Sequence, residues 1–129
     1  KKNELQKNVK IVNFTFNPFK YIAKSDLFVL SSLYEGLPNV LLETMVLKRY
    51  IISSNCPTGP SEILDNGKYG GLFPIKDYKN LSRKILEFSK NKKKYSNKIL
   101  KAYKSLKRFD KDEKCKSYLI KDKKLMEIN

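Results

Sequence analysis

The chain has 129 residues, a length that suits a single domain. It contains no histidine, which excludes Ser-His and Cys-His catalysis and the usual zinc sites. Cys56 and Cys115 stand far apart, so we expect two reduced thiols rather than a disulfide framework. Any chemistry must therefore depend on carboxylates, Lys and Arg, hydroxyls and backbone amides.

The formal net charge is +15, and it is unevenly distributed. Residues 82–129 contain 17 Lys and Arg against 6 Asp and Glu, which gives +11, whereas residues 1–81 contribute +4. Such a basic half is typical of proteins that bind nucleic acid or an anionic membrane surface. Lys is abundant along the whole chain, and we favour a general compositional bias as the explanation.

No apolar run approaches the roughly 18 residues that a membrane-spanning helix needs. No apolar segment follows Lys1-Lys2-Asn3-Glu4 as it would in a signal peptide. We therefore expect a cytoplasmic protein, with the inner face of the membrane as a further location that the basic half would permit. Because the first residue is Lys rather than Met, we expect the chain to be a piece of a longer protein.

Short strands and helices are predicted to alternate in the first half of the chain. Val9–Phe14 is predicted as a strand and Pro18–Lys24 as a short helix. Leu27–Leu30 is an apolar run, typical of a strand that is buried on both faces of a parallel sheet. Asn39–Leu47 repeats apolar residues at helical spacing, and Tyr50–Ser53 is predicted as the next strand.

Helices are predicted to dominate the second half. Pro60–Leu64 is predicted as a short helix and Gly71–Pro74 as a short strand. Asp77 is predicted to cap a helix, and Asp110 to cap the last one. Strands thus alternate with helices until about residue 75 and only helices follow, which indicates an α/β fold with a parallel sheet.

The stretch SLYEGLPNVLLE, residues 32–43, follows a predicted strand and runs into the next helix. Ligands of open parallel sheets bind at the carboxyl ends of the strands. A carboxylate lies at each end of this segment, and each can accept hydrogen bonds from the hydroxyls of a sugar ring. Glu35 and Glu43 are therefore candidates for contacts with two rings.

Phosphate binding is predicted between these two carboxylates. The first amides of a helix favour phosphate, and Gly36 lets the backbone approach a ligand closely. Pro38 removes one donor, whereas Asn39, Val40 and Leu41 are expected to keep theirs. Phosphates at the helix start with a hydroxylated ring on either side describe a nucleotide-sugar.

Two segments resemble the C-terminal domain of retaining, two-domain GT-B glycosyltransferases of the group-1 family. They are SDLFVLSSLYEGLPNVLLETM, residues 25–45, and SNCPTGPSEILDNGKYGGLFPIKD, residues 54–77. The family signature is a pair of glutamates with seven residues between them, which Glu35 and Glu43 match. The form CPTGPSEIL most resembles bacterial members that add hexose or N-acetylhexosamine to capsular, lipopolysaccharide or lipid-linked glycan chains.

The resemblance covers about residues 8–90 and implies a fold and a domain division. The fold would be a partial Rossmann-like parallel sheet with flanking helices, followed by C-terminal helices. Residues 1–108 would form a partial donor-binding domain, and residues 109–129 a C-terminal helix. The family enzymes are much longer and carry an acceptor domain and a diphosphate-gripping basic pair before this region. We therefore expect that this chain alone does not transfer sugar.

The resemblance also implies roles for individual residues. Glu35 would be the catalytic residue, which contacts the donor sugar and supports the charge that develops during transfer. Glu43 would bind the ribose of the nucleotide. The donor would further be held by the backbone of Gly36, Leu37, Asn39 and Val40. Neither a metal nor a cofactor is implied, and the expected partners are a UDP-sugar and a glycan or lipid-linked acceptor.

A different class of function is a basic helical module that binds nucleic acid or an anionic membrane. Tyr95, Tyr103, Phe109 and Tyr118 are interleaved with Lys, as in proteins that bind single strands. These rings recur at helical spacing, which predicts packing against other helices instead. No nucleic-acid-binding signature accompanies them, and we expect no nucleic-acid partner.

Overall fold

The computed structural model describes residues 4–109. The helix predicted after Asp110 and Cys115 lie outside these residues. The described elements follow one another as η1 (Glu4–Lys7), α1 (Phe19–Lys24), β1 (Leu27–Leu30), α2 (Asn39–Val46), β2 (Tyr50–Ser54), α3 (Pro60–Ile63), β3 (Gly71–Phe73), α4 (Tyr78–Lys90), η2 (Lys92–Tyr95), α5 (Ser96–Ser105) and η3 (Leu106–Phe109).

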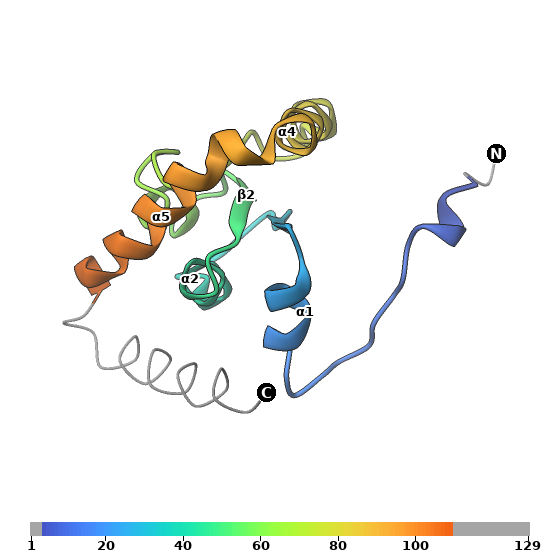
Figure 1. Cartoon of the computed structure of the whole chain (residues 1–129), viewed down its shortest axis with the longest axis horizontal. Coiled ribbons are helices and arrows are strands. Elements are labelled where there is room, and N and C mark those ends of the chain that lie inside the picture. The colour runs from blue at the N-terminus through green and yellow to red at the C-terminus, as the bar shows by residue number, and fades with distance from the viewer. Residues whose placement is uncertain (1–3, 110–129) are drawn as a thin grey trace.

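The three strands form one parallel sheet in the order β1-β2-β3. Leu30 lies opposite Ser53, and Ser54 lies opposite Phe73, so the carboxyl ends of all three strands meet at one edge. Helices flank the sheet (Figure 1). The predicted α/β class and parallel sheet are therefore confirmed. The predicted cap is confirmed too, because the Asp77 side chain accepts a 2.9 Å hydrogen bond from the Asn80 amide.

Strand β2 is the centre of the sheet, and all of its residues are buried. Alternate side chains of a strand point to opposite faces. Tyr50 and Ile52 pack with Phe73 of β3 and Phe88 of α4 on one face. Ile51 belongs to the cluster on the other face, which contains Leu41, Leu42, Met45, Ile63, Leu64, Ala102 and Leu106. The sheet thus carries an apolar layer on each side.

Strand β1 lies at an open edge of the sheet, and two predictions fail there. Leu27–Leu30 is only half-buried, with Val29 36% exposed, and β1 has a neighbour on one side alone. Val9–Phe14 forms no strand: Ile11 and Phe14 are 87% and 85% exposed. This segment runs away from the rest of the described chain (Figure 1), where it has no strand with which to pair.

No helix within residues 4–109 is both long and apolar enough to cross a lipid bilayer.

The ring of Phe88 anchors α4 to the sheet. It stacks on Tyr50 with a centroid distance of 5.0 Å and is only 4% exposed. We expect Phe88→Ala to lower the free energy of unfolding by about 3–5 kcal/mol, because it leaves a cavity in a packed layer. Leu86 lies on the same helix and is 55% exposed, so Leu86→Ala should cost less than about 1 kcal/mol. Urea unfolding followed by circular dichroism measures both, and equal losses would contradict this packing.

Burial also makes the stability sensitive to alkaline pH. It raises the pKa of Tyr50 from 10.0 to about 12, with Tyr95 and Glu87 adding to the rise. Between these values the unfolded chain releases the Tyr50 proton while the folded chain retains it. Stability should therefore fall as pH rises through this window, by at most about 3 kcal/mol. Tyr50→Phe should lose this part of the slope in pH-dependent urea unfolding, and an unchanged slope would contradict the assignment.

Candidate functional site

Two loops meet at the carboxyl edge of the sheet. One follows β1 and contains Glu35, and the other follows β2. The Ser54 hydroxyl donates a 2.6 Å hydrogen bond to the Ser32 carbonyl, and the Thr58 hydroxyl donates one of 2.8 Å to the Glu35 carbonyl. These side-chain bonds hold the Glu35 loop against the second loop. Sequence reasoning missed Ser32, Ser54 and Thr58. The available signal was their place in the sequence, with Ser54 at the end of β2 and Ser32 and Thr58 in the loops that follow β1 and β2.

Gly59 lets the two loops approach each other closely. Its φ is +87°, and a Cβ atom there would overlap the Gly36 carbonyl oxygen and lie 2.5 Å from Pro38 Cδ. Gly36, in contrast, is not closely packed, because a Cβ atom added to it would have no atom within 4 Å. The packing therefore requires glycine at position 59, whereas position 36 opens onto unoccupied space. That space is where the sequence predicts a ligand.

The carboxylate of Glu35 is held by its own loop. The Ser32 hydroxyl donates a 2.5 Å hydrogen bond to Glu35 Oε1, and the side chain is half-buried. This bond fixes the direction of the carboxylate at the carboxyl end of β1. A fixed carboxylate at such an edge can accept hydroxyl protons from a ring or support a nearby positive charge.

The second carboxylate lies one helical turn into α2. Leu41, Leu42, Thr44 and Met45 bury one side of this helix, while Asn39 and Glu43 share the partly exposed side. At 1.5 Å per residue, Glu43 lies about 6 Å along the axis from Asn39. Helical side chains lean toward the amino end, so Glu43 leans toward the turn that precedes α2. The structure thus brings the helix start and Glu43 together on one surface.

One amide of the helix start is already used. The Leu41 N–H donates a 2.9 Å hydrogen bond to the Pro38 carbonyl, so the expectation that Leu41 keeps its donor for a ligand is wrong. Pro38 is buried, whereas Gly36 and Leu37 are exposed and Val40 is half-buried. The candidate surface therefore consists of the Gly36–Leu37 backbone and the first turn of α2.

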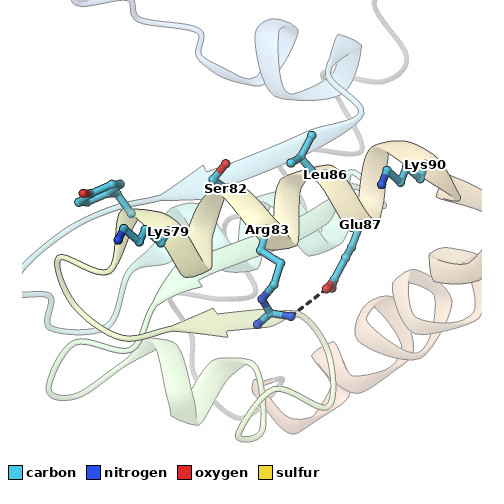
Figure 2. A pocket seen from close by; sticks show the side chains of 7 residues that line it. Lys79, Ser82, Arg83, Leu86, Glu87 and Lys90 are labelled. Atoms are coloured by element: carbon cyan, nitrogen blue, oxygen red, sulfur yellow. Dashed lines mark hydrogen bonds and ion pairs between the residues drawn. The ribbon is translucent and has the colours of Figure 1, made fainter.

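Two hollows of the described chain lie away from this surface. The larger, of about 550 Å³, lies along the outer side of α4, where Figure 2 shows Lys79, Ser82, Arg83, Leu86, Glu87 and Lys90. Neither this hollow nor a smaller one of about 320 Å³ is lined by Glu35 or Glu43. Residues 4–109 also contain no group of three Cys, Asp or Glu side chains that could hold a metal ion.

Cys56 lies in the second loop and is only 2% exposed. It is a free thiol within the residues that the structure describes. Cys115 is not part of the described region.

The parallel sheet, its flanking helices and the glutamate pair define a domain of the GT-B glycosyltransferase fold. The sequence model described as "Glycosyl transferases group 1" matches residues 1–112, and the chain belongs to this family. Among solved structures, the crystal structure of TarM is similar, with a TM-score of 0.66 at 26% identity. That match covers 87% of this chain and 22% of TarM.

Sequence relatives agree with this assignment. An uncharacterized glycosyltransferase of Methanocaldococcus jannaschii is 49% identical over 63 residues, which is 49% of this chain and 16% of that protein. A second relative, from Campylobacter jejuni, is 30% identical over 101 residues, which is 76% of this chain and 28% of that protein. It is named N-acetylgalactosamine-N,N'-diacetylbacillosaminyl-diphospho-undecaprenol 4-alpha-N-acetylgalactosaminyltransferase. The poly(ribitol-phosphate) alpha-N-acetylglucosaminyltransferase of Staphylococcus aureus is 30% identical over 67% of this chain and 18% of that protein. The chain thus spans less than a third of each of these relatives.

The contrast between the two glycines can be tested directly. We expect Gly59→Ala to lower the free energy of unfolding by more than about 2 kcal/mol, because its Cβ overlaps the neighbouring loop at a positive φ. Gly36→Ala makes the same chemical change one loop away and should change stability by less than about 1 kcal/mol. Urea unfolding measures both variants, and a larger loss for Gly36→Ala would refute the loop contact described above.

Proposed function

We propose that this chain is the donor-binding part of a glycosyltransferase that uses a nucleotide-sugar. The reaction would transfer a hexosyl or N-acetylhexosaminyl group to a capsule, lipopolysaccharide or lipid-linked glycan. One observation carries the proposal: a fixed carboxylate, an exposed glycine and the first turn of a helix with Glu43 lie together at the carboxyl edge of a parallel sheet. Two relatives named for N-acetylhexosaminyl transfer support the choice of sugar.

In this proposal each part of the surface contacts one part of the donor. The diphosphate lies against the backbone of Gly36 and Leu37 and the start of α2, at Asn39 and Val40, where the helix dipole favours negative charge. Glu43 accepts hydrogen bonds from the two ribose hydroxyls. Glu35 lies beside the donor sugar, where its carboxylate stabilises the positive charge that develops on the ring as the bond to diphosphate breaks.

The catalytic contribution is positioning and electrostatic support. Cleavage of the bond between the sugar and the diphosphate leaves negative charge on the leaving group and positive charge on the ring. The helix start stabilises the first and Glu35 the second, while the diphosphate oxygen itself can take the proton of the acceptor hydroxyl. No protein nucleophile is required in this scheme.

The isolated chain should bind the donor without turning it over. It spans 16% to 28% of the relatives described above, and Gly36 and Leu37 at its carboxyl edge are exposed. An exposed surface leaves the sugar in contact with water and supplies no acceptor site. We propose UDP as the nucleotide and the cytoplasmic side of the membrane as the location, where the +15 charge would favour contact with anionic lipids.

Titration of UDP into the 15N-labelled chain tests the donor site. We expect the largest amide shifts in residues 36–43 at the start of α2. Glu43→Gln should weaken UDP binding about tenfold, because a charged acceptor for the ribose is lost. Glu4→Gln removes the same charge from an exposed position in η1 and is the matched control.

Two results would contradict the proposal. Shifts confined to the basic helices α4 and α5, or equal weakening by Glu43→Gln and Glu4→Gln, would indicate nonspecific attraction of an anion to a cationic chain. Measurable turnover of a UDP-sugar by the isolated chain would contradict the proposed inactivity, while leaving the donor site itself in place.

A further inference from the structure

The smaller hollow lies at the end of the sheet opposite the proposed donor site. Tyr50 is the first residue of β2 and Gly71 the first of β3, and both line this hollow of about 320 Å³. Helices α4 and α5 contribute Lys84 and Lys98 to the lining. Its volume is within the range of small-molecule sites. None of the residues proposed to bind the donor belongs to it.

Two ammonium groups face this space without a carboxylate partner. Within residues 4–109 the ion pairs are Lys68–Asp65, Arg83–Glu87 and Lys92–Asp26, so neither Lys84 nor Lys98 is paired. Both side chains are half-buried. Burial and the neighbouring charge of Lys84 lower the pKa of Lys98. An anion between the two ammonium groups would relieve their repulsion.

A tyrosine hydroxyl belongs to the same lining. Tyr50 is only 5% exposed as a whole residue, and its hydroxyl oxygen lies 3.5 Å from the position of a Cβ atom added to Gly71. This oxygen is not among the buried, unpartnered polar atoms of the described residues, so it is accessible from the hollow. Like any tyrosine, Tyr50 keeps its hydroxyl proton at neutral pH, so this group can donate a hydrogen bond to an anion.

The one carboxylate in the lining does not cancel the positive charge. Glu87 Oε1 is 2.8 Å from Arg83 Nη1, and Figure 2 shows this pair on one side of α4. Glu87 is therefore paired with a group outside the lining of this hollow, although its charge still acts on Tyr50. Two ammonium groups and a hydroxyl donor remain available to a ligand.

We propose that this hollow binds a phosphate dianion, either inorganic phosphate or the phosphate group of a small phosphomonoester, through Lys84, Lys98 and the Tyr50 hydroxyl. Phosphate carries close to two negative charges at neutral pH and accepts strong charge-assisted hydrogen bonds from ammonium groups. The site is separate from the proposed donor surface, and neither proposal depends on the other.

Calorimetric titration of the 129-residue chain with inorganic phosphate at constant ionic strength tests this site. We expect saturable binding that Lys98→Gln weakens at least about tenfold, because a charged hydrogen bond is lost. Lys101→Gln removes the same charge from an exposed position of α5 and should change the affinity less than about twofold. Lys84→Gln is the second variant, and Tyr50→Phe removes the hydroxyl while keeping the ring.

Circular dichroism establishes that each variant is folded before its titration. Without phosphate, Lys98→Gln should be at least as stable as the parent chain, because one of two repelling charges is gone. A parallel titration with a hexose 1-phosphate separates the two ligand sources: tighter binding than inorganic phosphate assigns the site to phosphomonoesters, and equal binding assigns it to phosphate itself. Equal weakening by Lys98→Gln and Lys101→Gln, or the absence of saturation, would overturn the proposal.

Discussion

The contact between the two loops at the carboxyl edge of the sheet determines the geometry of the candidate site. Gly59 touches the carbonyl of Gly36, and the hydroxyls of Ser54 and Thr58 bond the backbone of the first loop. These contacts fix the Gly36 turn relative to β2, and hence relative to α2, which begins directly after it. The same contacts determine the position of Glu35, and the hydrogen bond from Ser32 fixes the direction of its carboxylate.

The apolar surface of the first third of the chain is unusual for a small α/β domain. Ile11, Phe14 and Phe16 are each more than 80% exposed, at 87%, 85% and 96%, and β1 has a free edge. Exposed apolar segments and unpaired edges are ordinarily covered in native proteins. The family to which the chain belongs contains proteins several times longer, and this edge is where further strands of a parallel sheet would add. Within the described residues, this apolar surface and the free edge of β1 are therefore left uncovered.

Local sequence signals predicted the elements whose formation depends on neighbours within the chain. Apolar runs, helical periodicity and the Asp77 cap identified the three strands of the sheet and the helices α1, α2, α3 and α4. The prediction for Val9–Phe14 was wrong because strand formation requires a partner, which a run of apolar residues cannot reveal. The hydrogen bonds of Ser54 and Thr58 also escaped prediction, since they join residues that are 22 and 23 positions apart. The spacing of Glu35 and Glu43 was visible in the sequence, whereas the contacts that hold the Glu35 loop at the carboxyl edge needed the fold.

The rotation of α2 about its own axis explains how one helix can contribute both to the core and to a ligand surface. Leu41 and Met45 are fully buried against Ile51 and Ile63, and this packing leaves Asn39 and Glu43 on the opposite side. A rotation of the helix that turned Glu43 inward would bring Met45 out of the core, at a cost of about 2–5 kcal/mol by analogy with truncation of a buried side chain. The core therefore holds Glu43 at the surface with a strength that no single surface contact could supply. In the proposed donor complex, apolar packing on the far side of α2 would hold the Glu43 carboxylate in position for its contact with the ribose.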